Sequence, residues 1–199
     1  VVRVKPDAFL GNTFEGPVYT VLGSADLYER EDGQPFDKAA FHKDPTGHRS
    51  KFLPYVKLAK MYLACHYWDA RGPKILSAQD LKDPALTLEV IADISCDIGG
   101  PIDSTLRATK IADPFFGYDP STGKEVQAGT KGTITVMAVD NLPAELPRDA
   151  SDAFGRDLIE RVLPSLINDD KEDMIGRATI AEDGKLSEHF QYLAEYAKG

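Results

Sequence analysis

The chain has 199 residues, of which 42% are hydrophobic and 28% charged, as in an ordinary soluble globular protein with one full core, or one domain and part of another. Its net charge of −9 argues against non-specific nucleic-acid binding, which requires clustered Lys and Arg. No apolar stretch approaches the roughly eighteen residues of a membrane helix, and no signal peptide is visible. We therefore expect a cytoplasmic protein without a nucleic-acid or membrane partner.

The first third of the chain predicts short strands and short helices. Val1–Val4 reads as a strand that ends at Lys5-Pro6, because proline has no backbone N–H to donate. Since the chain begins within this strand, we expect a segment of a longer polypeptide. Pro17–Asp32 contains a second apolar run, and Phe36–Phe52 has helical character that is broken at Asp44-Pro45.

The middle of the chain predicts strands that alternate with helical segments. Met61–Tyr67 suits a buried strand, and Ser77 caps one or two helical turns. Leu86–Ser95 is nearly continuous in apolar residues, which is typical of a parallel strand covered on both faces. Further strands are expected within residues 112–123 and 131–141. This alternation indicates an α/β fold with a mainly parallel sheet.

The last quarter of the chain is predicted to be mainly helical. Apolar residues recur at intervals of three and four within Pro147–Asn168, which predicts an amphipathic helix. A strand-like Arg177–Ile180, a turn at Asp183-Gly184 and a helix over Ser187–Ala197 follow.

Three predicted strands end in polar segments: "ACHYWDARG", "DISCDIGG" and "VDNLP". Ligands in α/β sheets bind beyond the carboxyl ends of the strands. Gly99 and Gly100 would let a ligand approach the backbone closely, and the carboxyl groups of Asp93, Asp97 and Asp140 can accept hydrogen bonds. The alternative, that each aspartate only ends a strand or caps a turn, stays open.

The remaining reactive side chains give weaker signals. We interpret Cys65 and Cys96 as free buried thiols of a reducing compartment, with a disulfide as the alternative. The four histidines lack the spacing of a zinc site, so no metal is expected. We expect Arg71, Arg107 and Arg148 to be solvated or salt-bridged, the alternative being contact with phosphate or a substrate carboxylate.

The segments "DISCDIGGPIDST", "PFFGYDP" and "TVMAVDNLPAELPRDASDAFGRDLI" give the chain a family resemblance. The sequence resembles saccharopine dehydrogenases and the lysine–2-oxoglutarate reductase part of aminoadipic semialdehyde synthase, within the wider alanine dehydrogenase and transhydrogenase superfamily. "VDNLPAELPRDAS" is the most specific of these strings. An acid at Asp140 and the "PFFGYDP" segment favour the saccharopine branch over the alanine branch.

The resemblance implies a partial Rossmann-type parallel sheet with a C-terminal helix that returns toward a substrate domain. Residues 1–145 would be the later part of a nicotinamide dinucleotide-binding domain, and residues 146–199 the crossover helix and return segment. The positions that match the family's cofactor-facing residues are Ala64, Cys65, His66, Asp97, Gly99, Gly100, Asp140, Asn141, Leu142 and Pro143.

The resemblance also implies an NAD- or NADP-dependent oxidoreductase that acts on amino acid C–N bonds. Its reaction would join lysine and 2-oxoglutarate to saccharopine, or reverse this. Asp97 and Asp140, the expected active-site residues, would fix the nicotinamide ribose and amide or the substrate ammonium, without being the main acid–base catalyst.

Two parts of the family pattern are missing from this sequence. The chain contains no G-x-G-x-x-G phosphate-binding turn and lacks the N-terminal substrate domain that carries the family's Lys and His acid–base residues. We therefore expect the N-terminal half of the same enzyme as a partner, and an inactive segment without it. An alanine-dehydrogenase-like enzyme and a non-catalytic regulatory or partner-binding module are the alternatives.

Overall fold

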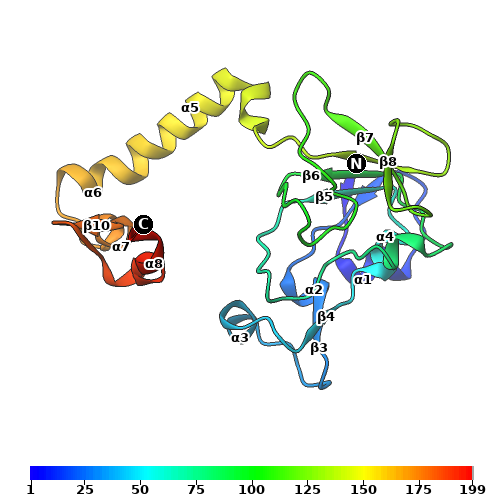
Figure 1. Ribbon diagram of the computed structural model, residues 1–199, viewed down its shortest axis with the longest axis horizontal. Coiled ribbons are helices and arrows are strands. Elements are labelled where there is room, and N and C mark those ends of the chain that lie inside the picture. The colour runs from blue at the N-terminus through cyan, green and yellow to red at the C-terminus, as the bar shows by residue number, and fades with distance from the viewer. Residues whose placement is uncertain (199) are drawn as a thin grey trace. The chain divides into compact units, whose positions relative to one another are not determined.

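The computed structural model describes residues 1–198 (Figure 1). The chain forms two compact units, Val1–Leu142 and Pro143–Gly199. The 3-10 turn η2 (Leu142–Glu145) contains the point at which one unit gives way to the next. Within residues 1–198, no helix is long and apolar enough to span a membrane.

The first unit is built on a five-stranded sheet with the order β5-β6-β9-β7-β8. The strands are β5 (Met61–Ala64), β6 (Val90–Asp93), β7 (Phe115–Asp119), β8 (Lys124–Val126) and β9 (Ile134–Met137). β5, β6 and β9 run parallel, whereas β7 and β8 form an antiparallel hairpin at one edge. The predicted α/β class with a mainly parallel sheet is confirmed, with three of the five strands of this sheet running parallel.

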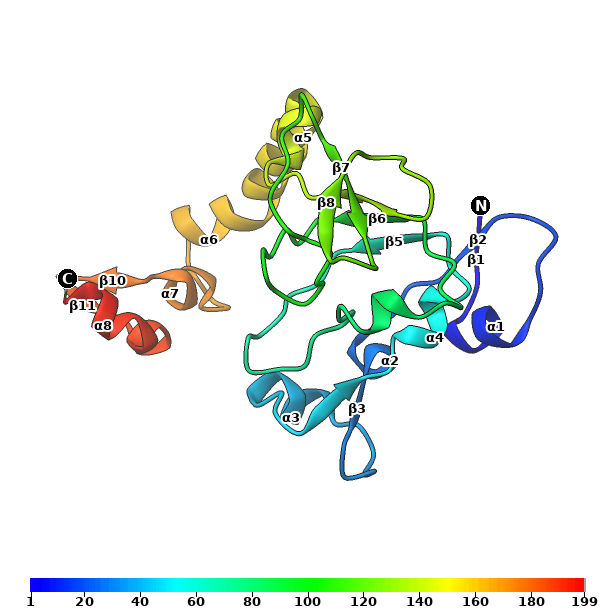
Figure 2. The same cartoon turned by 45° about the vertical axis from the view of Figure 1, so that its right-hand side comes forward.

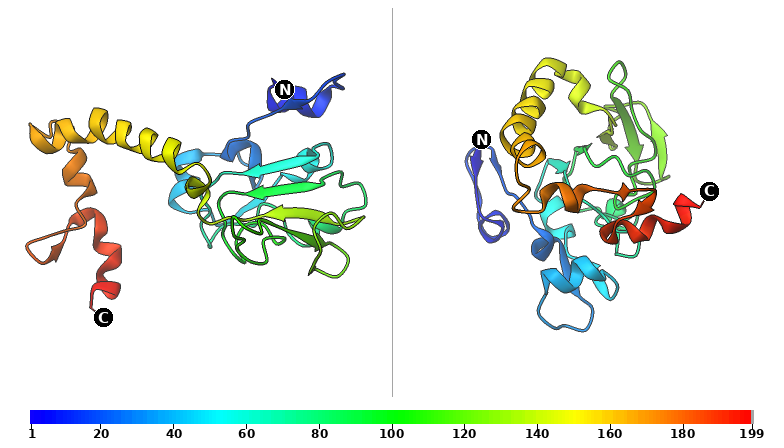
Figure 3. Two further views of the ribbon diagram at one scale, coloured as in Figure 1. Left: turned by 90° about the horizontal axis from the view of Figure 1, so that it is seen from above. Right: turned by 90° about the vertical axis from the view of Figure 1, so that its left-hand side faces the viewer.

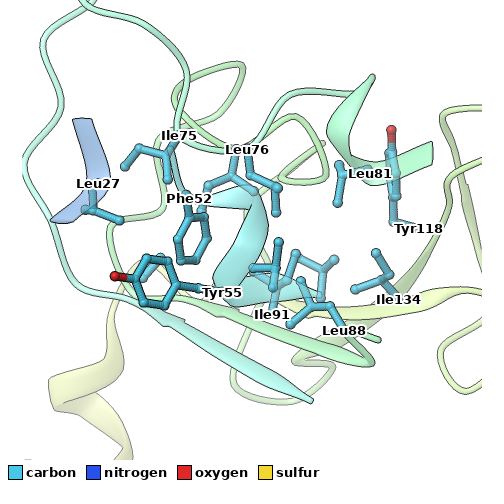
Figure 4. Close-up of a cluster of buried hydrophobic side chains, with 14 of the residues drawn as sticks. Leu27, Phe52, Tyr55, Ile75, Leu76, Leu81, Leu88, Ile91, Tyr118 and Ile134 are labelled. Carbon is cyan, nitrogen blue, oxygen red and sulfur yellow. The ribbon is translucent and has the colours of Figure 1, made fainter. Parts of the chain in front are cut away.

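The hydrophobic core lies on one face of this sheet. Neighbouring strands place Ile91, Val136 and Phe116 opposite one another, and all three are buried. Figure 4 shows Ile91, Ile134 and Tyr118 near Leu76 and Leu81, which come from the connections between strands. Along β9, the buried residues Ile134 and Val136 alternate with more exposed ones, which is the period of two that a half-buried strand requires.

The opposite face of the sheet is less covered along β5, which corrects the expectation of a buried strand there, whereas β6 is covered on both faces as expected. β5 ends at Ala64 rather than at Tyr67, and Met61 and Leu63 are 56% and 59% exposed. The predicted strand over Leu86–Ser95 is also shorter, since β6 contains only Val90–Asp93. A run of apolar residues does not distinguish strands covered on both faces from edge strands such as β5.

Residues before the sheet form two small strand pairs with short helices. The strands are β1 (Val2–Arg3), parallel to β2 (Val18–Tyr19), and β3 (Tyr28–Arg30), antiparallel to β4 (His48–Ser50). The helices are α1 (Pro6–Gly11), α2 (Ser24–Leu27), α3 (Lys38–Lys43) and α4 (Leu53–Val56). Figure 2 shows β1 beside β2 next to α1, and the 3-10 helix η1 (Asp80–Lys82) follows β5 along the chain.

Local sequence signals explain several of these boundaries. Pro6 is the first residue of α1, a position at which the missing N–H of proline costs no helical hydrogen bond. Asp37 caps α3, since its carboxyl oxygen accepts a hydrogen bond from the Ala40 N–H at 2.9 Å. The Ser77 hydroxyl accepts from the Asp80 N–H at 3.2 Å and so closes the turn that leads into η1, although the N-cap residue of η1 is Gln79 rather than the predicted Ser77.

The second unit begins with the predicted long helix. Its successive parts are α5 (Pro147–Asp157), the π-helical η3 (Leu158–Val162) and α6 (Leu163–Ile167). Pro164 cannot donate to the carbonyl one turn earlier, and a π-helical turn is one way for the backbone to accommodate such a gap. Leu158, Ile159 and Leu166, on the predicted apolar face, are 38%, 63% and 60% exposed.

The end of the second unit differs from prediction at one segment. Its elements are α7 (Met174–Ala178), the antiparallel pair β10 (Ala181–Glu182) and β11 (Lys185–Leu186), then η4 (Glu188–Leu193) and α8 (Ala194–Ala197). The strand predicted over Arg177–Ile180 is wrong, because Arg177 and Ala178 belong to α7. The Asp170 carboxyl group accepts from three N–H groups at the start of α7, of Met174, Ile175 and Gly176, and so stabilises a helix there. The predicted turn at Asp183-Gly184 joins β10 to β11.

We predict that Gly117→Ala destabilises the protein. Gly117 is buried in β7, and a Cβ atom there would lie 2.6 Å from the Gln127 carbonyl oxygen and 2.9 Å from Cγ2 of Val126. Backbone cannot yield as a flexible side chain can, so we expect a loss of about 1–3 kcal/mol in the free energy of unfolding, measured by urea denaturation. Gly11→Ala is the control, because a Cβ atom at Gly11 meets nothing within 4 Å. Equal stability of the two variants would contradict the prediction.

Candidate functional site

The carboxyl ends of β5, β6 and β9 lie at one edge of the sheet, because the three strands are parallel neighbours (Figure 3). The polar segments that follow these strands are those singled out in the sequence, beginning at Cys65, Ile94 and Ala138. This edge is where α/β proteins bind ligands. The structure therefore brings together the three strand ends on which the sequence-based site prediction depends.

Side chains after β6, the middle one of the three parallel strands, connect all three ends. The Ser95 hydroxyl donates to the Ala64 carbonyl at 3.2 Å and accepts from the His66 N–H at 3.1 Å. The Cys96 thiol donates to the Ala138 carbonyl at 3.1 Å. Ser95 thus holds the end of β5 and Cys96 holds the end of β9.

Asp93, at the end of β6, does not have the role that we expected for it. Its side chain is completely buried, and its two carboxyl oxygens accept hydrogen bonds from the Cys96 N–H at 3.0 Å and from the Thr105 hydroxyl at 2.6 Å. Both oxygens are therefore used inside the protein. The expectation that the Asp93 carboxyl group is available to a ligand is wrong, and the strand-end alternative holds for this residue.

His66 and Cys96 lie in an acidic environment. Burial lowers the pKa of His66, and the negative charges of Asp93 and Asp97 partly oppose this. Burial also raises the pKa of the Cys96 thiol, and Asp93, Asp140 and Asp97 raise it further. The Nε2 atom of His66 lies 2.9 Å from the Tyr62 hydroxyl.

Asp97 and Asp140 keep carboxyl groups that are open to a ligand. Asp97 is half-buried and Asp140 is exposed, and neither side chain hydrogen-bonds to any residue from 1 to 198. In this they differ from Asp93. An exposed or half-exposed carboxyl group can accept hydrogen bonds from hydroxyl, amide or ammonium groups.

The two adjacent glycines serve different purposes. Gly99 is exposed with φ of +68°, and a Cβ atom there would meet nothing within 4 Å. Gly100 is buried, and a Cβ atom there would lie 2.7 Å from Cβ of Asp97 and 2.8 Å from the Asp97 carbonyl oxygen. Its N–H donates to this same oxygen at 2.9 Å. Gly99 therefore offers accessible backbone, whereas Gly100 is required for the tight turn that carries Asp97.

The other predicted site residues are spread over both units. Ala64 is buried, Cys65 and Asn141 are exposed and Leu142 is half-buried, all in the first unit. Pro143 belongs to the second unit. The sequence did not point to three residues whose hydroxyl groups support the site: Tyr62 contacts His66, Ser95 binds the end of β5, and Thr105 donates to Asp93. Ser95 adjoins Cys96 in the quoted motif, but no sequence pattern identifies Thr105 as a partner of Asp93.

Both cysteines are free, as predicted, but only one is shielded. Cys96 is half-buried, whereas Cys65 is exposed because β5 ends before it. The predicted burial of Cys65 is wrong. No group of three or more His, Cys, Asp or Glu side chains within residues 1–198 is arranged to hold a metal ion.

The arginines are salt-bridged or exposed, as expected. A nitrogen of Arg71 lies 2.6 Å from the Asp69 carboxyl group, and one of Arg107 lies 2.9 Å from that of Glu125. The Arg107 guanidinium group also lies over the Phe116 ring at 5.0 Å. Arg148 is exposed.

Comparison with known proteins supports the family resemblance. The chain is 35% identical over 198 residues to alpha-aminoadipic semialdehyde synthase of Arabidopsis thaliana, covering 91% of this chain and 18% of the relative. It is 27% identical to the mitochondrial enzyme of that name from Mus musculus, covering 87% of this chain and 22% of the relative. The chain is homologous to a segment of these enzymes. The resemblance drawn from the sequence motifs is confirmed.

A third relative is a saccharopine dehydrogenase of Emericella nidulans, described as NAD(+), L-lysine-forming. It is 30% identical, over 58% of this chain and 29% of the relative. The chain thus spans less than a third of each of these three proteins. No family model matches the chain. A solved structure of an L-alanine dehydrogenase aligns with 74% of this chain and with 38% of its own chain, at 18% sequence identity. Its TM-score of 0.43 is too low to define a common fold.

We predict that His66 titrates below the ordinary histidine pKa of 6.5, because burial disfavours the imidazolium. Because the pKa of His66 is lower in the folded state than in the unfolded state, the unfolded state binds the proton at a higher pH. The free energy of unfolding therefore falls as the pH decreases from about 7 through the folded pKa. NMR titration of His66 measures the pKa, and urea denaturation across this pH range measures the stability. His66→Gln, which cannot titrate, should lose this part of the pH dependence. A His66 pKa at or above 6.5 would contradict the prediction.

Proposed function

We propose that this chain contributes the nicotinamide end of a dinucleotide site to an oxidoreductase that acts on amino acid C–N bonds, with saccharopine as its substrate or product. The observation that carries the proposal is the pair of free carboxyl groups, Asp97 and Asp140, beyond the ends of parallel strands in a chain homologous to saccharopine-metabolising enzymes. Formation of saccharopine from lysine and 2-oxoglutarate, or the reverse reaction, is the specific form of the proposal.

The residues present fit a nicotinamide nucleotide in chemistry and placement. Such a cofactor supplies hydride transfer when it is bound. Asp97 and Asp140 would accept hydrogen bonds from ribose hydroxyls, from the carboxamide or from a substrate ammonium group. Gly99 leaves its backbone accessible, and Cys65 and His66 border the same edge. The fungal relatives named as NAD(+)-dependent favour NAD over NADP.

The local charge also suits the proposed substrate. Asp97 and Asp140 follow the carboxyl ends of the neighbouring parallel strands β6 and β9, and burial favours the neutral form of His66. A cationic amino group is therefore better accommodated here than an anionic phosphate. Phosphate binding is assigned to the glycine-rich turn, which this sequence does not contain.

The larger organisation forms part of the proposal. Residues 1–145 would be the later part of the dinucleotide domain, and residues 146–199 the crossover helix and return segment. The relatives' greater length supports the N-terminal half of the same enzyme as a partner, with the main acid–base residues there. Cytoplasmic location remains a prediction, and the mouse relative is named as mitochondrial.

We predict that Asp140→Ala and Asp97→Asn, made in the natural full-length polypeptide, each lower kcat/KM for saccharopine-dependent NAD⁺ reduction. Loss of a hydrogen bond to a bound ligand should reduce it by about tenfold or more, which corresponds to about 1.4 kcal/mol. Steady-state absorbance of NADH measures the rates, and thermal unfolding checks that the fold is intact.

Glu15→Ala is the matched control, because it removes an exposed acid from a loop away from the strand ends. It should leave kcat/KM unchanged. Full activity of both aspartate variants would contradict their proposed roles and favour the strand-end interpretation. A wild-type protein that neither binds NADH nor oxidises saccharopine would contradict the function itself and favour a non-catalytic module.

A further inference from the structure

We propose that Thr105 is a positioning residue for the candidate site. Its hydroxyl group, acting through the Asp93 carboxyl group, fixes the turn Ser95–Gly100 and with it the side chain of Asp97. The consequence for cofactor binding rests on the proposed function, whereas the effect on the turn does not.

The connection from Thr105 to the turn is short and buried. Thr105 is 1% exposed and donates its hydroxyl proton to Oδ2 of Asp93 at 2.6 Å. The other oxygen of Asp93 accepts from the Cys96 N–H at 3.0 Å. With Asp93 completely buried, loss of the hydroxyl would leave Oδ2 without a donor among residues 1–198. A buried acceptor without a partner is strongly unfavourable, so the Asp93 side chain would move.

Cys96 is the residue that needs this support. Its φ of +52° lies in the left-handed region, which residues with a Cβ atom seldom adopt. The Asp93 carboxyl group holds its N–H, and the Ala138 carbonyl holds its thiol. When Asp93 moves, Cys96 can relax to a negative φ. This rotation redirects the next residue, Asp97.

Thr105 itself is anchored to another part of the core. The Pro101 carbonyl accepts from the N–H groups of Ile75 and Leu76 at 2.8 and 3.0 Å. The Asp103 N–H donates to the Leu76 carbonyl at 3.0 Å. The segment before Thr105 is thus fixed to the buried residues Ile75 and Leu76. Because Thr105 is buried, it cannot touch a ligand at this edge and acts only through Asp93.

The test compares Thr105→Val with the natural full-length polypeptide. Valine keeps the volume of threonine and removes the donor. We expect iodoacetamide to alkylate Cys96 at least about fivefold faster in the variant, because the turn opens more often. Peptide mass spectrometry reads Cys96 separately, with the exposed Cys65 as the internal reference. We expect the NADH dissociation constant, from fluorescence titration, to rise by a similar factor.

Two further variants separate positioning from general destabilisation. Thr105→Ser keeps the hydroxyl donor, so its Cys96 alkylation rate and NADH dissociation constant should equal those of the natural protein. Thr87→Val removes a hydroxyl that donates to the Lys57 and Ala59 carbonyls, at the opposite edge of the sheet, and should change neither value. If Thr105→Val fails to fold, Thr105→Ala leaves room for a water molecule and should give an intermediate rate.

Unchanged alkylation of Cys96 in Thr105→Val, or an equal rise in Thr87→Val, would overturn the proposal. Faster alkylation with unchanged NADH affinity would overturn the link from the turn to the cofactor while retaining the role in the turn. Absence of NADH binding in the natural protein would count against the proposed function alone, since the alkylation rates still report on Thr105.

Discussion

The candidate site depends on one buried acidic side chain, Asp93. A carboxyl group removed from water requires hydrogen-bond donors, and the fold supplies two, the Cys96 N–H and the Thr105 hydroxyl. The turn held in this way places Cys96 against the end of β9, while the preceding Ser95 contacts the end of β5. Residues that follow β6 therefore fix the positions of the ends of β5 and β9 on either side of it.

The sequence predicted where the polar site lies better than it predicted what each polar residue does. Strands that end in acids and glycines were sufficient to place Asp97 and Asp140 at one edge. They were insufficient to separate these residues from Asp93, because burial is decided by packing from elsewhere in the chain. The partner of Asp93 is Thr105, twelve residues later, and nothing in the local pattern indicates that pairing.

The secondary structure was likewise predictable where it depends on the local sequence and not where it depends on distant residues. The long helix after Pro147 was predictable, since its apolar periodicity is a local property. The exposure of Met61 and Leu63 was not, because it depends on which distant segments cover that face of the sheet. The strand predicted at Arg177–Ile180 is wrong because the Asp170 carboxyl group accepts hydrogen bonds from N–H groups in the first turn of α7 and stabilises a helix there.

The edge position of β5 has a consequence for handling the isolated chain. Along its outer side, the backbone N–H and C=O groups of Met61–Ala64 face no other strand of residues 1–198. Natural proteins protect such edges with charged side chains, proline or a covering segment, whereas here Met61 and Leu63 are exposed. Strand-to-strand association between molecules is favoured at such an edge. In the isolated chain, this edge is therefore where pairing between strands of two molecules would begin.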